Sequence, residues 1–359
     1  MPTRADQTIG TRASAAVSIH SAPLILPVCA PPVEDGSVLV RGDRVLRVGP
    51  RAEIEAAYSD LTPVRWPGMI VPGLIDAHLR LGRTALAPAV VHGVTAVGGV
   101  AGDLEAASAL GEAGLGGVTY LETRCEDETR WEEDGRDRLI TAIREVDHPG
   151  IIGIAAHSPD PVVMEDLAIL SRTFGLRLHV ELGRHPAGFL DEVGALGPGC
   201  HVATSGPLDE ADRKLLRIRG TAVAISSPFA ADGLLDGANI IAIGTHTGGD
   251  PLAAARVLAR DPGLDREPGP DRGLDRLLVE AVTLGGARAL GLAEGPGRLG
   301  CLGPGSRADF AVFAVKADER TAYSALLHEG PGRCVATIVG GRPHWRPDET
   351  QDVETRRPA

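Results

Sequence analysis

Eight short apolar runs rich in β-branched residues alternate with helical patterns between residues 70 and 244. The predicted strands are 70–78, 93–97, 118–121, 151–155, 176–180, 201–203, 222–225 and 240–244. This alternation is typical of βα units and a parallel sheet. Eight such units predict an α/β fold, a TIM (β/α)8 barrel, whose sites lie at the carboxyl ends of the strands.

The two ends of the chain have a different pattern, with short strands and turns. Residues 37–40 and 45–48 predict a hairpin around 41–43, and residues 52–58 predict a short helix. Neither end is long enough to bury a core alone, because a small β unit needs at least three strands and a covered face. We expect residues 1–14 and 346–359 to be disordered.

Composition narrows the class of protein. The chain is 43% hydrophobic but only 3% aromatic, which suits an aliphatic barrel core. Its net charge of −12 argues against a nucleic-acid partner, since phosphate contacts need a basic surface. Five cysteines without CxxC spacing indicate neither a disulfide framework nor a zinc knuckle. With no apolar run of about 18 residues, we expect a cytoplasmic protein with no membrane partner.

The first predicted strand carries a recognisable motif. The stretch Pro-Gly-Leu-Ile-Asp-Ala-His-Leu-Arg at 72–80 resembles the Pro-Gly-x-Ile-Asp-x-His-x-His hallmark of the amidohydrolase superfamily. Residues 285–291 and 294–315 resemble the last barrel helix and the closing segment of that family. The resemblance implies a barrel at 71–294 and a small β-sandwich built from residues 15–70 and 295–345.

The same resemblance implies a reaction. It is strongest to imidazolonepropionases and to aminofutalosine- and guanine-type deaminases, which hydrolyse non-peptide C–N bonds in cyclic amides or aminated heterocycles. In that family, histidines on strands one and five and an aspartate on strand eight hold zinc or iron. The metal-bound water is the nucleophile.

Most of the implied ligand positions are altered in this chain. Two family histidines are kept, on strand one and after strand four, as His78 and His157. An arginine stands where strand one has its second histidine, and arginine cannot ligate a metal. The altered positions are Arg80 on strand one, Glu181 and Arg184 on strand five, Thr204 on strand six and His246 on strand eight.

Three hypotheses remain open at this point. The first is a hydrolase whose metal, zinc or iron, is held by His78, Glu181 and His246. The second is a metal-free enzyme with His246 or Glu181 as general base and Arg80 stabilising negative charge. The third is a catalytically silent ligand-binding or partner subunit. The candidate catalytic residues are His246, Glu181 and His157, and the candidate substrate-binding residues are Arg80, Arg184, Thr204 and His157.

We expect Arg80 to bond Glu181 in the space of the ancestral metal, because an Arg–carboxylate pair neutralises both charges without an ion. No cofactor is therefore expected, with one divalent metal as the alternative. A small molecule is expected in the barrel mouth, and a homo-oligomer is left open. We also expect 122–138 to be a solvated loop and helix, and 261–276 to be a flexible insertion acting as a lid.

Overall fold

The computed structural model describes residues 16–82, 86–146, 150–183, 185–236, 238–260 and 273–347. The expected disordered ends, apart from residues 346 and 347, and most of the expected insertion at 261–276 lie outside the described residues. The end of that expected insertion is helical, because α10 already begins at Leu274. Within the described ranges, every helix is too short or too polar to span a bilayer.

The predicted barrel is confirmed. Eight parallel strands pair in chain order from β6 to β13, and a bridge between Leu79 and His246 closes the sheet. The barrel strands are β6 (Leu74–Arg80), β7 (Val94–Ala101), β8 (Gly116–Arg124), β9 (Ile151–His157), β10 (Arg177–Glu181), β11 (Cys200–Thr204), β12 (Ala222–Ile225) and β13 (Ile241–Ile243).

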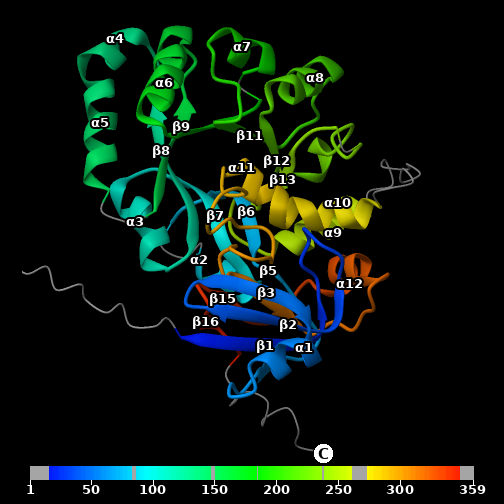
Figure 1. The fold of residues 1–359 in the computed structure, drawn as a ribbon. Helices are drawn as coiled ribbons and strands as arrows, with labels where there is room; N and C mark the ends of the chain where they lie inside the picture. Colours follow the sequence, from blue (N-terminus) through cyan, green and yellow to red (C-terminus); the bar gives the residue numbers. More distant parts are fainter. Residues whose placement is uncertain are drawn as a thin grey trace, which may run out of the picture.

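Helices surround the barrel (Figure 1). Asp160 caps α6 and Asp209 caps α8 through side-chain oxygens that accept backbone N–H groups, as N-terminal caps do. The helices are α2 (Leu86–Val91), α3 (Leu104–Glu112), α4 (Glu128–Arg130), the π-turn η1 (Trp131–Gly135), α5 (Arg136–Glu145), α6 (Pro161–Phe174), α7 (Ala187–Glu192), α8 (Glu210–Arg219), η2 (Pro228–Ala230), α9 (Pro251–Ala259), α10 (Leu274–Glu280), the π-turn η4 (Ala281–Gly285) and α11 (Gly286–Ala289).

A second sheet joins the two ends of the chain beside the barrel (Figure 1). Its order is β16-β15-β14-β5-β1-β2-β3, with β4 also paired to β1. Val38, Phe310 and Ile338 share one hydrophobic cluster, so strands from both ends enclose a common core. The elements are β1 (Val17–Ile25), β2 (Val33–Arg41), β3 (Arg44–Pro50), α1 (Arg51–Ala57), β4 (Val64–Arg65), β5 (Met69–Pro72), β14 (Phe310–Phe313), α12 (Ala322–Glu329), β15 (Cys334–Val339) and β16 (Arg342–Trp345).

Gly73 carries the chain from the second sheet into the barrel. The first predicted run, 70–78, is divided there into β5, which pairs with β14, and β6, which begins the barrel. A Cβ on Gly73 would lie 2.0 Å from Thr95 Oγ1, so only glycine fits this position. The Gly73 amide donates to the Asp309 carbonyl at 3.0 Å. The sequence Pro-Gly therefore fixes how the first strand enters the site.

Candidate functional site

Side chains from five strands converge at the carboxyl ends of the barrel strands. Alternate residues of a strand point to the same face, so β6 directs Asp76, His78 and Arg80 inward together. The same rule directs His179 and Glu181 of β10 inward. Inward side chains of the other strands are Tyr120 and Glu122 on β8, His157 on β9 and His201 on β11.

His246 follows β13, and its backbone joins the end of this last strand to β6, the first strand. Its amide donates to the His78 carbonyl at 2.8 Å, and its carbonyl accepts from the Arg80 amide at 2.9 Å. The φ of His246 is +63°, a left-handed conformation that is uncommon for a residue other than glycine. This turn brings His246 Nδ1 within 3.0 Å of His78 Nε2.

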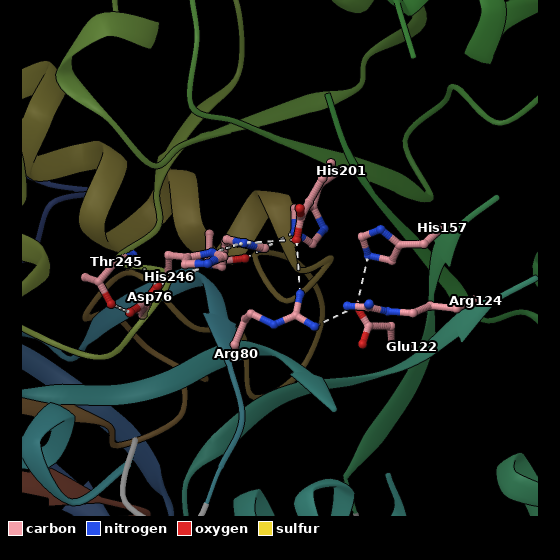
Figure 2. Close-up of polar contacts among 11 residues, drawn as sticks. Asp76, Arg80, Glu122, Arg124, His157, His201, Thr245 and His246 are labelled. Atoms are coloured by element: carbon pink, nitrogen blue, oxygen red, sulfur yellow. Dashed lines mark hydrogen bonds and ion pairs between the residues drawn. The ribbon is translucent and has the colours of Figure 1, made fainter. Parts of the chain in front are cut away.

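A chain of polar contacts crosses the mouth of the barrel (Figure 2). Arg80 Nη1 donates to Glu181 Oε1 at 3.4 Å, and Arg80 Nη2 donates to Glu122 Oε1 at 2.6 Å. His157 Nε2 lies 3.4 Å from the same Glu122 oxygen. The expected contact between Arg80 and Glu181 is present, but the shorter contact of Arg80 is with Glu122.

Glu122 belongs to the site, although the sequence predicts a solvated loop and helix for residues 122–138. Strand β8 runs to Arg124, beyond the apolar run at 118–121, and therefore carries Glu122 into the barrel mouth. Its side chain is only 6% exposed. Burial alone would raise the pKa of Glu122, but hydrogen bonds from Arg124 and Arg80 outweigh it, and the pKa lies below its usual value. Glu122 is therefore a carboxylate.

His78, His179 and Glu181 form a compact group of metal-ligating type. One ligand atom of each lies within 4.8 Å of the others. Neither ring nitrogen of the fully buried His179 has a hydrogen-bond partner among the described residues, and neither does His78 Nδ1. Burial lowers the pKa of His78 to about 3 and that of His179 well below its usual value. Two neutral imidazoles and a carboxylate suit a divalent metal such as zinc.

This group differs in one member from the set expected from the sequence. His179 takes the place that was assigned to His246, because β10 directs both His179 and Glu181 inward. The family pattern had drawn attention to position 181 alone. Buried imidazole nitrogens without partners are costly unless something binds them, so His179 favours a ligand at this point.

A polar layer below the site has its hydrogen bonds satisfied. His201 Nδ1 shares a hydrogen bond of 3.1 Å with the Tyr120 hydroxyl, and His201 Nε2 lies 3.1 Å from the Ala77 carbonyl. Burial lowers the pKa of His201 to about 3. His201 is therefore a packed structural histidine.

Asp76 connects the first strand to the loop after the last strand. Its Oδ1 accepts from the amides of His78 at 3.2 Å and Thr245 at 3.0 Å, and its Oδ2 accepts from the Thr245 hydroxyl. Burial raises the pKa of Asp76 to about 6, although these hydrogen bonds oppose the shift. Asp76 therefore positions His78 and the segment that carries His246.

Two expected substrate-binding residues are not found among the side chains that converge at the barrel mouth. Thr204 has the same parity on β11 as Cys200 and Val202, which pack in the outer core, so its side chain leaves the barrel interior. Its hydroxyl donates to the Gly206 carbonyl at 2.8 Å instead. The inward residue of this strand near the site is Ala203. Arg184 lies outside the described residues.

Two cavities open beside the cluster. One, of about 1010 Å³, includes His157 and Arg124 in its wall and extends under the helices that follow β8. The other, of about 760 Å³, includes Arg80 and lies against α2 and α3. The network of Arg80, Glu122 and His157 therefore has space for a small molecule on either side.

Comparison with known proteins agrees with this architecture. A curated 5-methylthioadenosine/S-adenosylhomocysteine deaminase of Natronomonas pharaonis is 28% identical over 77% of this chain and 72% of its own length. An adenosine deaminase structure from Xanthomonas campestris with bound zinc superimposes with a TM-score of 0.74 at 19% identity, covering 94% and 96% of the two chains. E. coli guanine deaminase superimposes with a TM-score of 0.74 at 15% identity, covering 93% and 100%.

No family model matches the sequence. The barrel, the second sheet, the first-strand motif and the likeness to deaminases nevertheless agree with one another. Together these observations support membership of the amidohydrolase superfamily, and the proteins that the chain resembles include deaminases.

Proposed function

We propose that this protein hydrolyses C–N bonds in aminated or amide-containing nitrogen heterocycles, with one divalent metal held by His78, His179 and Glu181. The observation that carries the proposal is the convergence of these three side chains, two of them buried imidazoles with unpartnered nitrogens. Bound zinc in a similar structure supports the alternative of one divalent metal over the expected absence of a cofactor. When bound, such an ion lowers the pKa of a coordinated water.

The remaining residues of the cluster have separate roles in this proposal. His246 stands at the strand-eight position of the family aspartate, and its imidazole accepts the proton that the reacting water gives up. Its hydrogen bond with His78 fixes the orientation of the ring. Arg80 and His157, both in contact with Glu122, face the cavities and orient polar groups of a heterocyclic substrate in the barrel mouth.

The test is zinc titration of metal-free protein, followed by thermal denaturation and elemental analysis. We expect one equivalent of zinc to bind and to raise the Tm of wild type. His179→Asn should lose this response, whereas the matched change His157→Asn should keep it. Release of ammonia from a panel of aminopurines and aminopyrimidines then tests the reaction. A wild type that binds no zinc and releases no ammonia contradicts the proposal.

Ligand binding without catalysis is a second candidate function, and Arg80 favours it. A guanidinium within 3.4 Å of Glu181 and 2.6 Å of Glu122 already neutralises these carboxylates without an ion. Under this alternative, zinc leaves the Tm unchanged, while a heterocycle from the same panel raises the Tm and is recovered unaltered.

A further inference from the structure

The guanidinium of Arg80 is shared unequally between two carboxylates at the barrel mouth. Arg80 Nη2 donates to Glu122 Oε1 at 2.6 Å (Figure 2), whereas Arg80 Nη1 donates to Glu181 Oε1 at 3.4 Å. Charge-assisted hydrogen bonds between nitrogen and a carboxylate are typically about 2.7–2.9 Å long. The contact with Glu181 is therefore the weaker of the two.

The two carboxylates also differ in what they would lose without Arg80. The side chain of Glu122 is 6% exposed, and that of Glu181 is 32% exposed. A buried carboxylate that loses its counter-ion keeps an uncompensated charge, whereas water solvates an exposed one. The second guanidinium at Glu122, that of Arg124, is itself mostly in solvent. Separation of Arg80 from Glu122 therefore costs more free energy than separation from Glu181.

The end of β7 explains how Arg80 reaches Glu122. Strand β7 lies between β6 and β8 and ends at Ala101. Gly102 follows, and a Cβ there would lie 3.6 Å from Glu122 Oε2. Because position 102 has no side chain, Arg80 extends across the end of β7. The cavity of about 760 Å³ includes both Arg80 and Gly102 in its wall, so the guanidinium has room to turn.

We propose that Glu122 is a positioning residue, which keeps Arg80 from occupying the cation site at Glu181. This inference rests on the proposed metal group of His78, His179 and Glu181, and it adds a residue outside that group. When the site is filled, Arg80 loses its bond to Glu181, keeps its bond to Glu122 and turns toward the cavity beside α2 and α3. Its positive charge then faces the space where a substrate binds.

The balance of charge at the mouth favours this movement. Without an ion, the guanidiniums of Arg80 and Arg124 balance the carboxylates of Glu122 and Glu181. Repulsion from a cation at Glu181 favours the position of Arg80 that is farther away, beside Glu122. If Glu122 is made neutral, Glu181 is the carboxylate that remains to Arg80 among the described ion pairs. Arg80 then competes with the cation more strongly.

The experiment compares the zinc affinities of metal-free, full-length variants by isothermal titration. We expect Glu122→Gln to bind zinc about tenfold more weakly than wild type, because one charge-assisted hydrogen bond no longer restrains Arg80. Glu126→Gln is the matched control. It also removes one carboxylate beside the mouth, but Glu126 is exposed and pairs with Arg130, so this variant should keep the affinity of wild type.

A double variant separates positioning from a structural role. Glu122→Gln combined with Arg80→Gln should bind zinc as tightly as Arg80→Gln alone, to within about threefold, because no guanidinium is left to restrain. The recovered affinity would also show that the buried amide at position 122 does not prevent folding. A residue that only supported the fold would lower the affinity equally with and without Arg80, and this result would overturn the inference.

Two other results would overturn it and leave the metal group in place. One is an equal affinity of wild type and Glu122→Gln. The other is zinc binding by Arg80→Gln but not by wild type, which would mean that Glu122 does not hold the guanidinium away from Glu181. If neither wild type nor Arg80→Gln binds zinc, the metal group itself is contradicted, and the inference falls with it.

Discussion

Arg80 is the residue that most sets this site apart from the family pattern. Its guanidinium contacts Glu181, a member of the group of three ligand-type side chains, and also Glu122. A fixed positive charge a few ångströms from a metal position opposes the binding of a cation. Arg80 and a divalent ion therefore compete for the Glu181 carboxylate.

We predict that Arg80→Gln binds zinc at least about tenfold more tightly than wild type, which corresponds to ~1.4 kcal/mol. Isothermal titration of metal-free protein measures the difference. Arg124→Gln is the matched control, since Arg124 bonds Glu122 but makes no ion pair with Glu181 among the described contacts. Equal affinities for wild type and Arg80→Gln would mean that the guanidinium moves away without cost.

His20 makes the stability of the second sheet depend on pH. Its ring is buried, and Trp66 Nε1 donates to His20 Nδ1 at 3.2 Å, which requires the neutral ring. Burial, with a smaller effect of Arg346, lowers the pKa of His20 to about 4 from an ordinary 6.5. The unfolded chain therefore takes up this proton first, and the stability contributed by the neutral ring is present above pH 6.5 and lost as pH falls toward 4.

The predicted loss between pH 7 and pH 4.5 is about 2–3 kcal/mol of unfolding free energy. Urea unfolding at the two pH values should show this loss in wild type and a correspondingly smaller one in His20→Gln. His344→Gln serves as the control. His344 is exposed, and this variant keeps the buried ring of His20, so it should lose as much stability as wild type. If His20→Gln loses as much stability as wild type, the acid sensitivity arises elsewhere.

At the scale of elements, the passage from β5 to β6 depends on the absence of one side chain. The Cβ of an alanine at position 73 would overlap Thr95, and relief of this overlap would displace β6 or β7. Overpacking of this kind costs about 2–3 kcal/mol.

We therefore expect Gly73→Ala to lower the free energy of unfolding by that amount and to weaken zinc binding, since His78 and Arg80 move with β6. Gly188→Ala is the control, because nothing lies within 4 Å of a Cβ built there and α7 gains a better helix former. Denaturant titration of both variants checks the prediction. If Gly73→Ala had the same free energy of unfolding as wild type, the passage from β5 to β6 would be flexible enough to accept the added methyl group.

At the scale of the whole molecule, the second sheet covers one end of the barrel. The Thr337 hydroxyl of β15 donates to the Val90 carbonyl of α2 at 2.7 Å, and a Cβ on Gly93 would meet Ala311 of β14 at 2.8 Å. Removing the two chain ends would expose this buried surface to water.

A chain of residues 71–293 alone should therefore aggregate, whereas residues 16–347 should stay monodisperse and unfold cooperatively. Gel filtration and thermal denaturation of the two truncated chains distinguish the outcomes. A soluble and cooperative 71–293 would mean that the barrel does not need the second sheet.

The sequence predicted the architecture well because buried parallel strands are nearly continuous apolar runs, and all eight barrel strands were found. The sequence was less informative about the site, because the barrel strands continue there into polar residues that the apolar pattern does not mark as strand. Glu122 was missed because β8 continues past its apolar part. His179 was missed because a histidine in a strand centre is usually structural. Thr204 was misplaced because the family pattern was followed instead of the alternation of the strand.

The closure of the barrel relates ligand binding to the transient opening of the sheet between its first and last strands. The first and last strands meet through Leu79 and His246, and His246 is also the neighbour of His78 in the site. A ligand that holds these two side chains together also holds the two edges of the sheet together, and by thermodynamic reciprocity the closed sheet holds the ligand. Amide hydrogens of Arg80 and His246 should therefore exchange with deuterium more slowly once the site is filled, while those of β9 and β10, on the opposite side of the ring of strands, keep their rates.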